Sequence, residues 1–123
     1  MNSIYRLKKS EVFQETFEKG AKNKFKNLFF INILENSKNK NMKIGIAVSK
    51  KFGHAPYRNR IKRQVRDILS KQELSKLDSH NYVFVFSKKF CELSYADKEK
   101  ELAAYIKVIK NGNYKKQKEK KSK

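Results

Sequence analysis

The side chains best suited to binding chemistry are concentrated between Ser49 and Arg66, in the stretch SKKFGHAPYRNRIKRQVR. This stretch contains seven Lys and Arg residues and no Asp or Glu. Guanidinium and ammonium groups donate charge-assisted hydrogen bonds to phosphate oxygens, and cations that no acid neutralises attract polyanions. Most charge runs are simply solvated surface helices. The complete absence of acids here favours a polyanionic partner instead.

A loop followed by a helix is expected to position these cations. Gly53 and Pro56 divide the stretch, because Pro fits the first helical turn and disfavours helical angles in the residue before it, Ala55. From Pro56 onward, apolar residues recur at three- and four-residue steps and form one stripe for a core: Tyr57, Ile61, Val65, Ile68 and Leu69. Another side of the helix carries Asn59, Lys62, Arg63 and Arg66, with Arg58 at its border and Arg60 near Asp67 on a third side.

Groups that catalyse hydrolysis in protein nucleases are sparse in this chain. Such enzymes use clustered carboxylates that hold metal ions, or a His-based acid–base pair. The twelve acids are scattered, no D-x-D or H-x-x-x-H spacing occurs, and His54 and His80 lie far apart. We interpret His54 as a loop or RNA-contact residue. Lys88 and Lys89 near Cys91 would lower the pKa of its thiol, but an ordinary structural cysteine is the simpler interpretation.

The basic stretch also resembles a known signature, that of the bacterial ribonuclease P protein component. The family pattern is a Lys-Lys-x-Gly turn, then Arg-Asn-Arg-x-Lys-Arg, then a further Arg. Pro56 departs from it, where the family usually has a branched apolar residue, and so does Asp67, where the family often has Glu. Chain length, element order and a basic tail fit as well, so the resemblance covers nearly the whole chain. The matching positions are Lys50, Lys51, Gly53, Ala55, Arg58, Asn59, Arg60, Lys62, Arg63 and Arg66.

The resemblance implies a protein subunit of the ribonucleoprotein endoribonuclease that removes the 5′ leader from precursor tRNA. The RNA partner would supply the catalytic centre and hold the Mg²⁺, so the resemblance assigns no catalytic residue, metal ligand or cofactor to the protein alone. It implies no DNA, membrane or obligate protein partner. Contacts to the catalytic RNA fall to Lys50, Lys51, Arg58, Asn59, Arg60, Lys62, Arg63 and Arg66. Contacts to the leader fall to Phe13, Phe17, Phe30, Asn32 and Lys88, although the family has an aromatic residue near Asn32 and an Arg near Ser87.

Composition limits the remaining possibilities. The chain has 123 residues, a net charge of +19, a pI of about 10.1 and 38% apolar residues, which is enough for one domain with a modest core. It contains no run of 18 apolar residues, and its beginning lacks the apolar region of a signal peptide. The single Cys cannot form an internal disulfide. These features predict a cytoplasmic protein.

Helices and strands are expected to alternate on both sides of the basic stretch. Before it, the patterns predict a helix over Glu11–Lys19, with Ser10 as its N-cap and Gly20 as its stop, and a strand over Phe25–Leu34. A second strand over Met42–Ser49 contains Gly45, which indicates a close backbone approach or a bulge. Only the resemblance adds a short strand over Ala21–Lys24.

After the basic stretch, Tyr82–Phe86 is apolar at every position, which predicts a strand that is buried on both faces. Ser94 opens the last helix, with Asp97 at capping-box spacing, and Gly112 can end it. The apolar stripe of this helix comprises Leu102, Tyr105, Ile106 and Ile109.

The expected fold is therefore a single α+β domain, an α/β sandwich with a mixed sheet and flanking helices in the order αβββαβα. By resemblance its βαβ crossover is left-handed. Residues 1–112 would form the RNA-binding domain, and residues 113–123 a disordered basic tail, in which Tyr114 to Lys123 include six Lys and one Glu.

Two questions stay open at this level. Spacing alone favours core packing for Phe13 and Phe17, whereas the resemblance favours a stacking platform for unpaired bases and leaves Val12 as the core residue. The alternative function is that of a structural RNA-binding protein such as a small ribosomal protein. A DNA-binding regulator is a weaker third, because nothing signals base-reading residues or a dimer.

Overall fold

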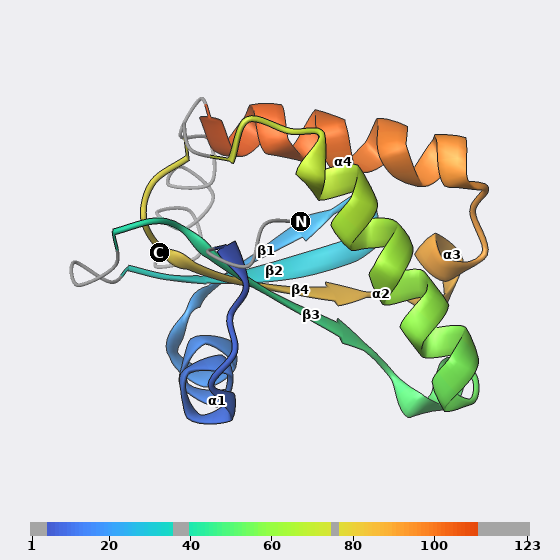
Figure 1. Ribbon diagram of the computed structural model, residues 1–123, viewed down its shortest axis with the longest axis horizontal. Helices are drawn as coiled ribbons and strands as arrows, with labels where there is room; N and C mark the ends of the chain where they lie inside the picture. Colours follow the sequence, from blue (N-terminus) through green and yellow to red (C-terminus); the bar gives the residue numbers. More distant parts are fainter. Residues whose placement is uncertain (1–4, 36–39, 75–76, 111–123) are drawn as a thin grey trace.

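The computed structural model describes residues 5–35, 40–74 and 77–110, and Figure 1 shows their arrangement. The expected order of elements is present, with one further short helix after the last strand. The elements are α1 (Ser10–Lys19), β1 (Ala21–Phe25), β2 (Phe29–Leu34), β3 (Lys43–Val48), the 3-10 turn η2 (Lys50–Phe52), α2 (Ala55–Ser70), β4 (Asn81–Phe86), α3 (Lys88–Cys91) and α4 (Tyr95–Lys110).

The four strands form one mixed sheet in the order β1-β2-β4-β3. β2 pairs antiparallel with both β1 and β4, whereas β3 and β4 run parallel and are connected through α2. The predicted α+β class, its mixed sheet and its flanking helices are thereby confirmed. The left-handed sense of the β3–α2–β4 connection stays a prediction.

One face of the sheet carries the core and is covered by α2 and α4 (Figure 1). Phe29 lies near the centre of this core, and its ring packs edge-on against Phe86, Phe90 and Tyr105. The predicted stripe of α2 is confirmed, because Ile61, Val65, Ile68 and Leu69 are all buried and Tyr57 packs against them. The stripe of α4 is buried as well: Leu102, Tyr105, Ile106 and Ile109.

α1 packs on the other face of the sheet, against β2 and β4. The prediction for Gly45 is confirmed there, because a Cβ atom at this position would lie 2.6 Å from two carbons of the Phe13 ring. β4 is therefore covered from both sides, as its uninterrupted apolar sequence predicts. No helix in the described part of the chain is long and apolar enough to cross a membrane.

Several expected boundaries are wrong. The strand predicted over Phe25–Leu34 is interrupted by a hairpin turn, in which Lys26 and Asn27 both have positive φ, so β1 ends at Phe25 and β2 begins at Phe29. Ser10 is the first residue of α1 and not its N-cap. Ala55 was expected to be the last residue of the loop, but it is the first residue of α2. Pro56 follows it within the first turn of the helix.

At the other end of the chain, Ser94 acts as predicted, since its Oγ accepts a hydrogen bond of 3.2 Å from the backbone N–H of Asp97. Gly112 and the predicted basic tail lie outside the described residues.

Candidate nucleic-acid interface

Strand register divides the α1 face of the sheet into rows of side chains. Paired residues point to the same side, so one row runs across all four strands as Lys22, Asn32, Val83 and Gly45. The next row along the strands consists of Lys24, Phe30, Val85 and Ala47. These two rows differ in what covers them.

α1 covers the first row. Its Phe13 ring lies over Gly45 at the β3 side, and its Phe17 ring lies 5.7 Å from the Nζ atom of Lys22 at the β1 side. Thr16, between these two on the helix, is fully buried. The helix therefore crosses the strands along this row, where Asn32, Val83 and Gly45 are buried and Lys22 at the β1 end stays exposed.

The second row is more accessible than the first, and we call the strip of surface formed by this row and the adjoining side of α1 the groove. Phe30 in its centre is 37% exposed, and Phe17 on the adjoining wall is 39% exposed, which makes them the exposed large hydrophobic residues of the described chain. Val85 and Ala47 are half-buried next to Phe30. Aromatic rings that stay accessible at the edge of a core suit stacking against bases.

Basic residues border the open end of this groove. β3 and β4 are parallel, so both end at the same edge of the sheet. Lys50 and Lys51 follow the end of β3, Lys88 follows the end of β4, and all three are exposed. The hydroxyl of Ser87 fixes the start of α3, because it accepts a hydrogen bond of 3.3 Å from the N–H of Phe90 and donates one of 2.8 Å to the carbonyl of Leu28.

Of the residues assigned to the leader, Phe30 lies in this row and Lys88 follows the end of β4, while Phe13 and Phe17 lie on α1 against Gly45 and Lys22 of the covered row. Asn32 is different. It belongs to the covered row, none of its surface is exposed, and neither its Oδ1 nor its Nδ2 has a hydrogen-bond partner. Alternation along β2 places Asn32 on the same face of the sheet as Phe30. Its burial, in contrast, depends on where α1 packs on that face.

α2 carries the second part of the interface, a group of cations on the side of the helix towards the N-terminal segment. Burial lowers the pKa of Lys62, and the positive charges of Arg66 and Arg58 lower it further. Burial and the charge of Arg6 likewise lower the pKa of Arg66. Such lowered values mean that the protein holds these cations close together at a cost, which a bound polyanion would relieve.

The sequence analysis missed Arg6 and Lys8 as part of this group. The N-terminal segment pairs with the outer edge of β3 through a parallel bridge between Arg6 and Ile44 and a hydrogen bond of 2.9 Å from the N–H of Leu7 to the carbonyl of Ile44. This pairing creates a hollow of about 260 Å³, lined by Arg6, Lys8, Phe13 and Arg66 among others. In the sequence, only the basic residues of this N-terminal segment, Arg6, Lys8 and Lys9, hinted at such a role.

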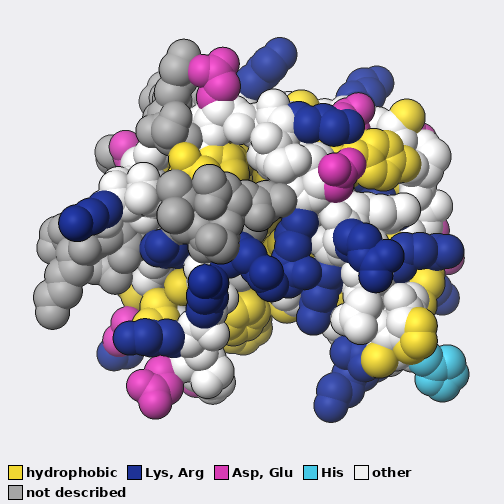
Figure 2. Space-filling model, viewed as in Figure 1, with side chains coloured by type: hydrophobic (Ala, Val, Ile, Leu, Met, Phe, Trp, Pro, Cys, Tyr) yellow, Lys and Arg dark blue, Asp and Glu magenta, His cyan; other side chains and the backbone are white. Residues whose placement is uncertain are grey.

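The remaining predicted RNA contacts divide into two kinds. Asn59 and Arg63 are exposed on the outer side of α2. Arg58 is partly committed to its own loop, since its Nε donates a hydrogen bond of 3.2 Å to the carbonyl of Gly53. Arg60 lies apart from the group, with its guanidinium 5.6 Å from the ring of Tyr57. Figure 2 shows Lys and Arg side chains gathered over the middle of the face that bears α2.

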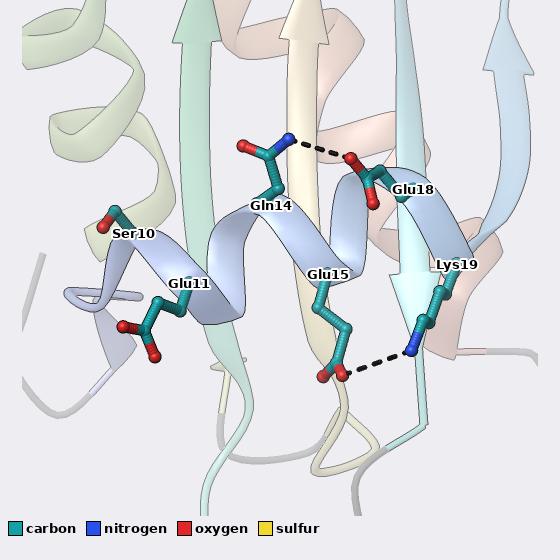
Figure 3. A pocket seen from close by; sticks show the side chains of 6 residues that line it. All are labelled: Ser10, Glu11, Gln14, Glu15, Glu18 and Lys19. Carbon is teal, nitrogen blue, oxygen red and sulfur yellow. Dashed lines mark hydrogen bonds and ion pairs between the residues drawn. The ribbon is translucent and has the colours of Figure 1, made fainter.

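The outer side of α1 has the opposite character. A shallow hollow there is lined by Ser10, Glu11, Gln14, Glu15, Glu18 and Lys19 (Figure 3). Gln14 donates a hydrogen bond of 2.8 Å to Glu18, and Lys19 pairs with Glu15 at 3.7 Å. The carboxylates make this side of α1 poorly suited to binding an anionic strand.

Groups suited to catalysis are not brought together in the described part of the chain. Within residues 5–35, 40–74 and 77–110, no three His, Cys, Asp or Glu side chains lie close enough to hold a metal ion. His54 is exposed at the N-terminus of α2. Cys91 is buried, and burial raises the pKa of its thiol despite the nearby Lys98, which agrees with a structural cysteine.

The fold and these surfaces define a class, a small basic α+β protein with exposed aromatic residues on one face of its sheet and a cationic helix on the other. Comparison with known proteins identifies the family. The family model described as Ribonuclease P matches residues 1–110. The ribonuclease P protein component of Geobacillus kaustophilus is 35% identical over 94% of this chain and 93% of its own length. That of Streptococcus agalactiae is 38% identical over 88% of this chain and 96% of its own length.

The solved structure of the Staphylococcus aureus RNase P protein superimposes with a TM-score of 0.75 at 26% identity, and covers 85% of this chain and 94% of that one. This chain therefore belongs to the ribonuclease P protein component family. It is a protein component of a ribonucleoprotein endoribonuclease, and its membership implies a partner RNA. The small ribosomal protein, the alternative that composition left open, is thereby set aside.

Proposed function

We propose that this protein binds the catalytic RNA of ribonuclease P through the cations of α2 and holds the 5′ leader of precursor tRNA in the groove beside α1. The proposal rests above all on the open row of the sheet, where accessible Phe30 and Phe17 adjoin Lys50, Lys51 and Lys88. Stacking surfaces next to ammonium groups suit an unpaired strand, and a 5′ leader is unpaired.

The cationic group on α2 supports the first half of the proposal. Burial lowers the pKa values of Lys62 and Arg66, neighbouring Arg charges lower them further, and no acid is among the causes that act on either group. RNA phosphates near them would relieve the repulsion and release counterions from the RNA. Lys50, Lys51, Asn59 and Arg63 extend the same surface. Arg58 and Arg60 would contribute less directly, since they also contact Gly53 and Tyr57.

The chemistry in this proposal belongs to the RNA, which would supply the catalytic centre and hold the Mg²⁺. The protein would contribute positive charge that offsets the repulsion between two RNAs, and a groove that positions one of them. The cytoplasm is the expected site of action.

Reconstitution tests the proposal. The purified protein is mixed with a large structured RNA of the ribonuclease P type and precursor tRNA at a low Mg²⁺ concentration, and release of the leader is followed. We expect efficient cleavage only when protein and RNA are both present, because the protein's charge replaces part of the cation requirement. Cleavage by the protein alone, or no effect of the protein on the RNA, would contradict the proposal.

A further inference from the structure

We propose that Tyr57 is a positioning residue, which holds Lys88 at a fixed place relative to the turn that carries Lys50 and Lys51. The inference rests on the proposed function, in which these lysines border the leader site. The sequence pattern assigned Tyr57 only to the apolar stripe of α2, and its ring does pack against the core. The proposed role is additional to that packing and requires no contact between Tyr57 and RNA.

The lysines concerned stand on two short elements that leave the sheet separately. β3 continues into η2, which carries Lys50 and Lys51, and β4 continues into α3, which begins at Lys88. Val48 and Phe86 are the last paired residues of these two strands. Beyond this pair the ladder of hydrogen bonds ends, so the sheet no longer sets the distance between the two elements.

Tyr57 lies in the first turns of α2 and contacts both elements. Its hydroxyl donates a hydrogen bond of 3.4 Å to the carbonyl of Cys91, the last residue of α3, which lies beside α2 (Figure 1). Its ring lies against Gly53, the residue that follows η2, because a Cβ atom there would be only 2.6 Å from the ring carbon Cδ2. One side chain therefore joins the two elements that carry the lysines.

Short stretches of hydrogen-bonded backbone connect each of these contacts to a lysine. α3 is a single helical turn, in which the N–H of Cys91 donates to the carbonyl of Ser87 at 3.2 Å, so a shift of Cys91 also moves Lys88. In η2 the N–H of Gly53 donates to the carbonyl of Lys50 at 3.5 Å. The backbone from which each lysine projects is therefore tied to a partner of Tyr57.

The surroundings of Tyr57 hold its side chain and its partner in place. Arg60, three residues further along α2, places its guanidinium 5.6 Å from the centre of the Tyr57 ring. The Nε of Arg58 donates a hydrogen bond of 3.2 Å to the carbonyl of Gly53, against which the ring lies. This end of α2 therefore forms a framework from which the Tyr57 hydroxyl holds α3.

Tyr57→Phe isolates the proposed role, because it keeps the ring against Gly53 and removes only the hydroxyl that holds α3. The assembled protein–RNA complex is prepared with wild-type protein, Tyr57→Phe, Lys88→Ala and the double variant, and its affinities for precursor and mature tRNA are measured. We expect Tyr57→Phe to lower the precursor-to-mature affinity ratio by about two- to tenfold, the range that one hydrogen bond contributes, and by no more than Lys88→Ala does.

The double variant shows whether the hydroxyl acts through Lys88. If it does, Tyr57→Phe should change the affinity ratio by less than about twofold once Lys88 is already Ala, because two residues that act as one unit are not additive. Effects that simply multiply would overturn the inference. An affinity ratio for Tyr57→Phe equal to that of the wild type would overturn it as well, although the leader site would stand.

Tyr82→Phe is the matched control, since it also removes a Tyr hydroxyl that donates to a backbone carbonyl, that of Asp78 at 3.0 Å. Tyr82 lies near the start of β4, at the end of the strand opposite to Lys88. We expect its variant to keep the wild-type affinity ratio, and an equal loss in both Tyr variants would show general destabilisation and overturn the inference. If Lys88→Ala itself leaves the ratio unchanged, the proposed leader contact of Lys88 fails and the inference falls with it.

Discussion

Phe29 and Phe30 are neighbours on β2 that point to opposite faces of the sheet, and replacing each by Ala separates core packing from leader binding. Phe29 is 1% exposed and packs against the rings of Phe86, Phe90 and Tyr105. Phe30 is 37% exposed in the floor of the groove. The two variants delete the same atoms from the same strand, so any difference between them reflects only the face.

The expected magnitudes differ in both stability and binding. Phe29→Ala empties a core site and should lower the free energy of unfolding by about 3–5 kcal/mol. Phe30 keeps over a third of its surface in solvent, so Phe30→Ala should lower it by roughly 1–2 kcal/mol. Phe30→Ala should also remove the stacking of one base, which weakens the binding free energy of the leader by about 1–3 kcal/mol. This corresponds to a roughly 5- to 150-fold loss of affinity for precursor tRNA.

Denaturant unfolding of the free protein measures stability, and binding of precursor and mature tRNA by the assembled complex measures the leader contribution. Phe30→Ala should reduce the affinity for precursor tRNA and leave that for mature tRNA unchanged. Phe29→Ala, assayed where it stays folded, should keep the wild-type ratio of the two affinities. The reasoning is refuted if Phe30→Ala weakens both tRNAs equally, or if it destabilises the protein as much as Phe29→Ala.

Four further predictions concern the charged residues. The double variant Arg63→Ala, Arg66→Ala should bind the partner RNA more weakly, and its binding should depend less on salt. The slope of log K against log salt concentration, measured by titration at several salt concentrations, should change by about 0.7–0.9 per lost phosphate contact. An unchanged slope would show that the RNA binds elsewhere. Lys62→Met should raise the free energy of unfolding modestly, because it removes a cation whose pKa is lowered by burial and by two Arg charges, yet it should weaken RNA binding. Lys107→Met, at an exposed site on α4, should change neither quantity. In the wild type, bound phosphates should raise the pKa of Lys62, so RNA affinity should fall as the pH rises towards the range in which free Lys62 loses its proton. Removal of residues 113–123 should leave the melting temperature unchanged and weaken RNA binding modestly, whereas a large drop in melting temperature would show that this segment packs on the domain.

Local patterns in the sequence predicted the elements that depend on periodicity. The stripe of α2 is visible because Ile61, Val65 and Ile68 repeat at helical spacing, and burial of that stripe directs the cations outward. Gly45 was informative for a related reason, since only a missing Cβ lets the Phe13 ring approach the strand. Such signals are carried by neighbours along the chain.

Features that depend on distant segments were not predictable in the same way. The hairpin turn at Lys26 and Asn27 has no Gly to mark its positive φ angles, so these turn residues were included in the strand predicted over Phe25–Leu34. Burial of Asn32 depends on which row α1 crosses, and alternation along β2 contains no information about that. Arg6 joins the cations of α2 only because its segment pairs with the edge of β3.

The location of the leader is the central claim, and a cleavage reagent attached to the protein tests it directly. An iron–EDTA group would be placed on the groove floor through Lys24→Cys, and in a separate variant on the acidic outer side of α1 through Glu18→Cys, both in a Cys91→Ala background. With precursor tRNA bound to the assembled complex, hydroxyl radicals generated at position 24 should cut the leader, and those generated at position 18 should cut it far less. Equal cutting from both positions, or none from position 24, would contradict a leader held in the groove.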